Sequence, residues 1–124
     1  MLKKKTILYL AIGWSLLIIF LSLVSLSSIK DPIKVPYKDK AVHFVFYFVF
    51  VLLWKLWNFK TSALKYSWII LLIAILLGIS IEYCQSLFTS DRKFEILDIV
   101  ANTFGALIGY IVTEKIIKSL KSHL

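Results

Sequence analysis

Four long hydrophobic runs, separated by short polar segments, dominate the sequence. They cover residues 6–26, 41–59, 66–88 and 94–117. A helix rises about 1.5 Å per residue, so about 20 residues cross a bilayer core, and only the second run is slightly short of that length. The short connections after the second and third runs favour antiparallel packing of neighbouring helices. We therefore predict an all-α fold, a four-helix transmembrane bundle made by a single domain, residues 1–124.

Composition and charge support a membrane location. The chain is 60% hydrophobic, against about 45–50% in soluble domains. Its net charge of +8 would also suit nucleic acid, but we expect no nucleic-acid partner, because the basic residues gather at the ends of the hydrophobic runs. If the N-terminus is cytoplasmic, the inner side holds one acidic residue, Glu114, and the basic residues Lys3, Lys4, Lys5, Lys55, Lys60, Lys65, Lys115, Lys118 and Lys121. This bias predicts an N-in, C-in topology, with the inner ends near anionic lipid headgroups.

The first run also has some features of a cleaved signal peptide, namely a lysine-rich start and small residues after an apolar stretch. Because that stretch is longer than the usual length of about 7–15 residues, we expect a retained span. Cys84 is the only cysteine, which excludes an intramolecular disulfide.

Polar residues interrupt the apolar runs at one level of the bilayer. With the predicted topology they lie at the outer ends of the last three helices, and they are Lys40, His43, Tyr47, Glu82, Gln85, Arg92, Glu95, Asp98 and Asn102. At about 100° per residue, the members on each helix share one face. An ionisable residue within a span is costly and is by default a functional-site candidate. We therefore predict an outer-leaflet polar pocket, and we expect no comparable set in the inner halves of these helices.

Two glycines indicate what the polar face of the last predicted helix packs against. Gly105 and Gly109 have the G-x-x-x-G spacing that lets two helices approach closely in lipid. They continue the face that carries Asp98 and Asn102, so this face should pack against a neighbouring helix rather than against acyl chains. Gly78 should serve the same purpose on the preceding helix.

Three motifs in this region resemble the VanZ-like membrane proteins. They are "DKAVHFVFYFVFVLLW", "EYCQSLF" and "RKFEILDIVANTFGALIG", and they keep their order and spacing over about residues 36–110. The resemblance implies a multi-pass protein of the bacterial cytoplasmic (inner) membrane, and the name-bearing member is associated with resistance to the glycopeptide teicoplanin. It implies no established reaction. Glu95 departs from the family's pattern, which has a small or hydroxylated residue there.

The main hypothesis is a binding pocket in the cell envelope. Membrane lipids are the expected partners, and the ligand would be the polar head of a lipid, a lipid-linked cell-wall precursor or an amphiphilic glycopeptide, a teicoplanin-resistance-like role. Lys40, His43 and Arg92 would contact phosphate or carboxylate, and the acidic and amide side chains would meet sugar hydroxyls or amides.

Two alternatives stay open. A membrane enzyme acting on a lipid phosphate is one, because a histidine and three carboxylates can bind a divalent cation or act as acid and base. The spacing matches no known metal motif and offers no evident nucleophile, so we expect no metal and no cofactor. The other is a structural or assembly subunit with a purely stabilising polar network that fixes helix register. A transporter with so few spans would need oligomers or partners.

Overall fold

Four α-helices account for most of the described chain. The computed structural model describes residues 3–23, 38–88 and 96–123, and no strand occurs within them. The helices are α1 (Lys4–Leu23), α2 (Lys38–Thr61), α3 (Trp68–Phe88) and α4 (Ile96–Ser122). Each is long and apolar enough to cross a membrane. The all-α, four-helix transmembrane fold is therefore confirmed, whereas the N-in, C-in orientation stays a prediction.

Several helix ends differ from the predicted limits. α1 begins at Lys4 rather than at residue 6, α2 begins at Lys38 rather than at residue 41, and α4 reaches Ser122 rather than residue 117. Charged residues end an apolar run without ending the helix, because the backbone hydrogen bonds continue past the apolar part. The predicted limits at residues 26 and 94 lie outside the described residues.

The connection between α2 and α3 explains why α3 starts at Trp68 rather than at residue 66. Ser62 has a φ of 52°, in the left-handed region, and this ends α2. The Leu64 N–H then donates to Oδ1 of Asn58 at 2.7 Å. Tyr66 therefore belongs to the connection and not to the helix.

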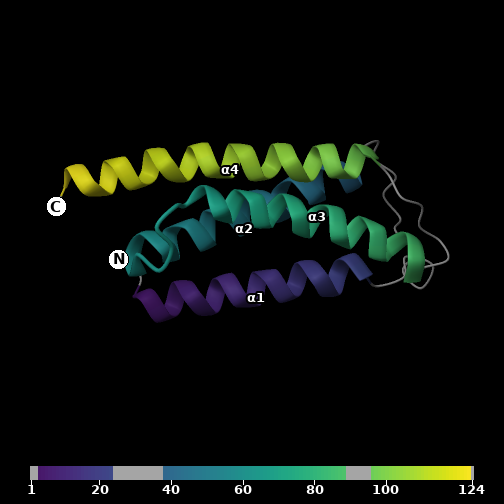
Figure 1. Cartoon of the computed structure of the whole chain (residues 1–124), viewed down its shortest axis with the longest axis horizontal. Coiled ribbons are helices and arrows are strands. Elements are labelled where there is room, and N and C mark those ends of the chain that lie inside the picture. The colour runs from purple at the N-terminus through teal and green to yellow at the C-terminus, as the bar shows by residue number, and fades with distance from the viewer. Residues whose placement is uncertain (1–2, 24–37, 89–95, 124) are drawn as a thin grey trace.

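α2 occupies the centre of the bundle. It packs against α1, α3 and α4, and its contact with α4 is the most extensive. α1 and α4 lie on opposite sides of α2 and share no contact within the described residues (Figure 1). Both termini lie at the same end of the bundle. We call this the terminal end, and we call the other, where α2 and α4 begin, the distal end.

Two glycines allow α4 to approach α2 closely. A Cβ on Gly105 would overlap the carbonyl oxygen of Phe44, and one on Gly109 would lie 2.7 Å from the carbonyl oxygen of Phe48. Neither backbone could stay in place beside a larger residue. The G-x-x-x-G face of α4 therefore lies against α2, as small-residue faces do in lipid.

Indole hydrogen bonds join α1 to α2. The Trp14 Nε1–H donates to the carbonyl oxygen of Phe46 at 2.8 Å, and the Trp54 Nε1–H donates to Oγ of Ser15 at 2.9 Å. The apolar core between the helices consists of Ile18, Tyr47, Phe50, Val51, Ile70, Ala74, Ile81 and Ala106. Many large apolar side chains on all four helices point outward instead, which suits contact with acyl chains.

Candidate functional site

Three helices bring polar side chains together at the distal end. This polar cluster consists of Lys40, His43 and Tyr47 from α2, Glu82 and Gln85 from α3, and Asp98 and Asn102 from α4. All except Lys40 are buried, with exposed fractions of 1–6%. Within each helix the members are three or four residues apart, so one face carries them all.

Asp98 lies between two cationic or titratable groups of α2. Its Oδ1 is 2.8 Å from Nζ of Lys40, and its Oδ2 is 3.7 Å from Nε2 of His43. Asp98 is also in the first turn of α4, where the positive end of the helix dipole stabilises a carboxylate. The Lys40 side chain is 19% exposed, against 7% for that of Asp98. Lys40 is therefore the edge of the cluster that a ligand would reach first.

Glu82 adds a second buried carboxylate from α3. One ligand atom each of His43, Glu82 and Asp98 lies within 4.8 Å of the others, and Glu82 also interacts electrostatically with the Tyr47 hydroxyl. Two carboxylates thus face one ammonium and one imidazole. A protonated His43 would bring the formal charge of the cluster to zero, which is the cheapest charge state away from water.

Two further polar groups complete the cluster. Asn102 lies against α3, because a Cβ on Gly78 would be 3.0 Å from its Nδ2. Within the described residues, the Tyr47 hydroxyl and Oδ1 of Asn102 are buried and make no hydrogen bond. Buried polar atoms normally have a partner, so these two atoms have hydrogen-bonding capacity that the described residues do not use.

Gln85 links the cluster to α1. Its Nε2 donates to the carbonyl oxygen of Ser22 at 2.5 Å, and both residues are buried. α1 therefore holds α3 in position at the distal end without contributing a charged group of its own among the described residues.

The structure brings together every predicted site residue that it describes. Arg92 and Glu95 lie outside the described residues. Gly78, Gly105 and Gly109 lie where helices approach one another. The binding role of all these residues stays a prediction.

The expectation that the other halves of the helices lack a comparable polar set is wrong. Lys55 of α2 is 1% exposed near the terminal end, and its Nζ lies 2.5 Å from Oε1 of Glu114 of α4. Asn58 and Thr113 are buried nearby. The sequence pattern groups Lys55 with the basic residues that predict topology, because it lies close to the end of an apolar run.

The helical period carries a signal for this second set. Tyr47, Val51, Lys55 and Asn58 follow one another at intervals of four, four and three residues, so Lys55 shares the buried face of Tyr47. Thr113 likewise continues the face of Gly109. The Thr113 hydroxyl donates to the carbonyl oxygen of Gly109 at 2.6 Å.

The fold and the buried ionic groups together define a multi-pass membrane protein with polar sites inside its helix bundle. The chain belongs to the VanZ/LLP1 family, whose family model matches residues 6–118. The predicted VanZ-like resemblance is therefore confirmed, and the match also includes α1, which we had compared only as a hydrophobic span.

A relative outside bacteria is also similar to this chain. An uncharacterized protein of Schizosaccharomyces pombe is 30% identical over 109 residues, which cover 85% of this chain and 66% of that protein. The chain thus spans about two-thirds of the length of this relative. No solved structure matches.

Proposed function

We propose that the polar cluster binds the polar headgroup of a lipid or of a lipid-linked envelope precursor. The observation that supports this is the convergence of seven polar side chains from three helices, six of them buried. Interhelical hydrogen bonds in lipid average about 0.6 kcal/mol each. Helix register alone is a weak reason to keep two carboxylates, an ammonium and an imidazole in one bundle.

The chemistry of the cluster suits a ligand with both an anionic group and neutral polar groups. Lys40, at the edge, is the cation that a phosphate would meet. Glu82 and Asp98 are acceptors for hydroxyl or amide hydrogens, and the Tyr47 hydroxyl and Asn102 amide extend this surface inward. A phosphate that carries a sugar or an amide has this combination.

The family adds context to the proposal. A relative in a yeast favours a lipid headgroup over an amphiphilic glycopeptide as the shared ligand, since phospholipids and lipid-linked sugars occur in yeast membranes as well as in bacterial ones. A teicoplanin-resistance-like role would then follow from binding an envelope precursor. We further infer an N-in, C-in orientation in a bacterial cytoplasmic membrane, supported by the lysines at the terminal end.

Native mass spectrometry of the full-length protein, extracted in mild detergent, tests the proposal. We expect the parent to retain one more lipid or lipid-linked molecule per chain than Asp98→Asn does. Thr113→Val is the matched control, because Thr113 is buried in the same helix but outside the cluster. Equal retention by the parent and Asp98→Asn would contradict the proposal, as would equal loss from Asp98→Asn and Thr113→Val.

A divalent-cation site is a second candidate. The observation that favours it is the set of ligand atoms from His43, Glu82 and Asp98, all within 4.8 Å of one another. An imidazole with two carboxylates suits Mn²⁺, Fe²⁺ or Zn²⁺, and a bound cation could polarise a lipid phosphate for hydrolysis. The Lys40 ammonium next to Asp98 opposes the binding of a second cation. We therefore place headgroup binding ahead of the metal site as the proposed function.

Titration of chelator-treated protein with Mn²⁺ and Zn²⁺, followed by elemental analysis, separates the two candidates. A metal site predicts about one ion per chain, lost in His43→Gln and in Glu82→Gln and retained in the control Glu114→Gln. Release of phosphate from a lipid-linked phosphate, dependent on that ion, would establish the enzyme. Absence of a stoichiometric ion would exclude the metal site.

A further inference from the structure

A cavity of about 430 Å³ lies at the terminal end, apart from the polar cluster. It is bounded by the end of α2, the connection to α3 and the last turns of α4, and its polar lining includes Lys55, Asn58, Lys65, Ser67, Glu114 and Lys121. Its volume lies within the range of about 300–1,000 Å³ that is typical of ligand sites. The cavity is therefore large enough for a headgroup.

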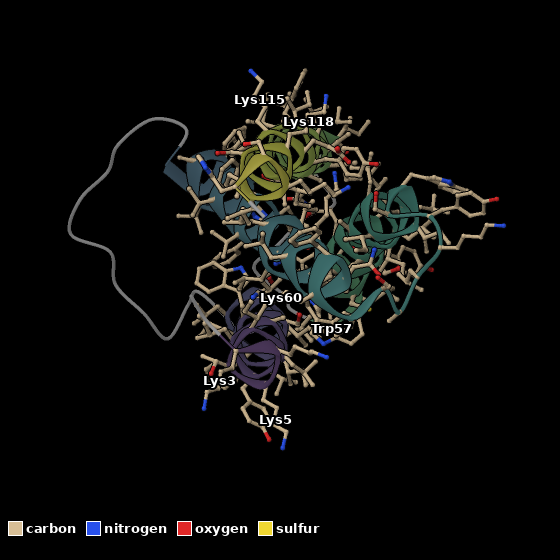
Figure 2. The ribbon with its side chains drawn as sticks, turned by 90° about the vertical axis from the view of Figure 1, so that its left-hand side faces the viewer. Lys3, Lys5, Trp57, Lys60, Lys115 and Lys118 are labelled. Atoms are coloured by element: carbon tan, nitrogen blue, oxygen red, sulfur yellow. The ribbon has the colours of Figure 1, made fainter. Side chains whose placement is uncertain are left out.

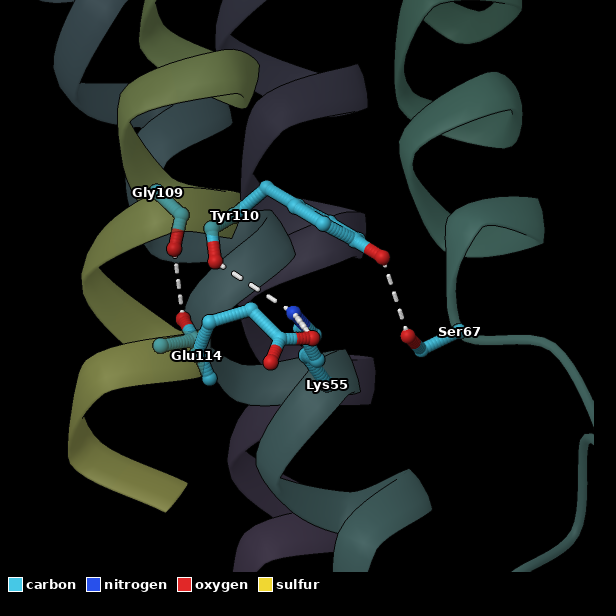
Figure 3. Close-up of polar contacts among 6 residues, drawn as sticks. Lys55, Ser67, Gly109, Tyr110 and Glu114 are labelled. Atoms are coloured by element: carbon cyan, nitrogen blue, oxygen red, sulfur yellow. Dashed lines mark hydrogen bonds and ion pairs between the residues drawn. The ribbon is translucent and has the colours of Figure 1, made fainter. Parts of the chain in front are cut away.

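Lys55 is the buried cation of this cavity (Figure 3). Its Nζ lies 2.5 Å from Oε1 of Glu114, 3.3 Å from the carbonyl oxygen of Tyr110 and 3.3 Å from the centroid of the Tyr110 ring. The Tyr110 hydroxyl is in turn 3.1 Å from Oγ of Ser67. α2, α4 and the connection that precedes α3 thus fix the ammonium in one place.

The two members of this ion pair differ in their access to water. The side chain of Lys55 is 1% exposed, whereas that of Glu114 is 43% exposed. A carboxylate with this exposure can turn toward water at little cost, but the ammonium cannot leave. Lys55 therefore keeps its position while its counterion can be exchanged.

The cavity carries an excess of positive charge. Three lysines line it, Lys55, Lys65 and Lys121, against the single carboxylate of Glu114, which gives a formal charge of +2. More lysines surround the same end of the bundle, and Lys3, Lys5, Lys60, Lys115 and Lys118 are labelled in Figure 2. The positive electrostatic potential of these lysines attracts anionic headgroups.

We propose that this cavity binds the phosphate-bearing headgroup of an anionic membrane lipid, with Lys55 as its buried cation. The phosphate takes the place of the Glu114 carboxylate beside Lys55, and Lys65 and Lys121 close over it. Asn58 and Ser67 provide hydrogen bonds to the headgroup. This site is independent of the polar cluster.

The apolar part of the lining favours a lipid over a soluble phosphate. Phe59, Leu64 and Ile117 share the cavity with the lysines. They can cover the glycerol and the first methylenes of the acyl chains, for which a free phosphate has no equivalent. The exposed apolar surfaces of the helices continue from this end toward the bilayer centre.

A pair of double variants tests the site. Lys65→Ala/Lys121→Ala removes two exposed lysines that line the cavity, and Lys115→Ala/Lys118→Ala removes two exposed lysines of the same end that do not line it. Both change the net charge equally. We would measure retention of phosphatidylglycerol, against phosphatidylcholine, by native mass spectrometry of the full-length protein in detergent. Asp98→Asn is present in every protein compared, the parent included, so that the polar cluster does not contribute to the retention.

We expect the first double variant to retain phosphatidylglycerol about tenfold more weakly than the parent, and the second to change it by less than about twofold. An equal loss in both would show general attraction of lysines for anionic lipid and would overturn the cavity site. Unchanged retention in the first would overturn it as well.

Two further measurements examine the exchange of counterion and the source of the phosphate. Glu114→Gln should retain phosphatidylglycerol several-fold better, because the competing carboxylate is gone, and unchanged or weaker retention would contradict the exchange. Millimolar inorganic phosphate should leave the bound lipid in place. Displacement of the lipid by inorganic phosphate would overturn the lipid assignment in favour of a soluble phosphate.

Discussion

The two ends of α2 hold buried charge in different ways. At the distal end, Lys40 and His43 face the carboxylates of Glu82 and Asp98, so the cluster can neutralise itself. At the terminal end, Lys55 has one carboxylate partner, which is itself partly exposed. A bundle can thus keep an ionisable group either by enclosing its counterions or by leaving room for one that comes from outside.

Loss of the α2–α4 contact should affect both ends at once and should be the largest single effect. In Gly105→Ala the new Cβ overlaps the carbonyl oxygen of Phe44, so the helices must separate. We expect a loss of about 3 kcal/mol in the free energy of unfolding, the upper end of typical overpacking costs. Denaturation by SDS, followed by circular dichroism, would measure it.

Gly13→Ala is the control for this variant. A Cβ on Gly13 meets nothing within 4 Å, and alanine is the better helix former by up to about 1 kcal/mol. Neutral or slightly stabilised protein is expected. Equal destabilisation by the two substitutions would show that close packing at Gly105 is not the cause.

The terminal end should respond unequally to loss of either ion-pair member. Glu114→Ala leaves Lys55 buried without its counterion, and we expect a loss of about 2–3 kcal/mol, below the full cost of breaking a buried pair because the cavity admits water. Lys55→Met leaves a carboxylate that is already 43% exposed, so the loss should be smaller. The same SDS denaturation compares them.

Adding anionic lipid should distinguish these two variants further. Phosphatidylglycerol should raise the melting temperature of Glu114→Ala more than that of the parent, because binding to the folded state stabilises it. Lys55→Met should gain little. The reverse order of lipid stabilisation would mean that the cavity does not accept an anion beside Lys55.

The distal end should tolerate loss of its central carboxylate better. In Asp98→Asn, Lys40 keeps a partly exposed side chain that can extend toward the headgroup region, and the amide still fits between its neighbours. We expect a loss of about 1–2 kcal/mol, in the range for a hydrogen bond to a charged group. A loss larger than that of Glu114→Ala would reverse the contrast between the two ends.

The smallest effect should come from the hydroxyl of Tyr110. Tyr110→Phe removes the contact with Ser67 but keeps the ring beneath the Lys55 ammonium. We expect about 0.5–1 kcal/mol, the net value of one neutral hydrogen bond. Tyr110→Leu removes the cation–π contact as well and should cost more, and equal unfolding free energies for the two variants would exclude a role for the ring.

The distal cluster could be predicted because its signal is local to each helix. Asp98, Asn102, Gly105 and Gly109 repeat at three or four residues, and the glycines indicate which face meets a neighbour. Lys55 carries the same periodic signal, but a lysine near the end of an apolar run also fits an interfacial position. Only the position of Glu114 across the helix contact distinguishes the two interpretations.

Helix limits were less predictable than helix identity. Hydropathy measures the part of a helix that suits the bilayer core, whereas Lys38 and Ser122 extend helices beyond it. The break at Ser62 depends on its φ of 52° and on the Asn58 side chain, and the hydrophobic pattern reports neither.

The central position of α2 has a consequence for synthesis of the chain. Its main partner, α4, is separated from it by α3 and is synthesised after α3. Lys40 and Lys55 therefore enter the membrane before Asp98 and Glu114 have been made. Until α4 has been synthesised, the nascent bundle carries two cations that still lack their α4 carboxylates, so the insertion of α4 is the step that pairs both of them.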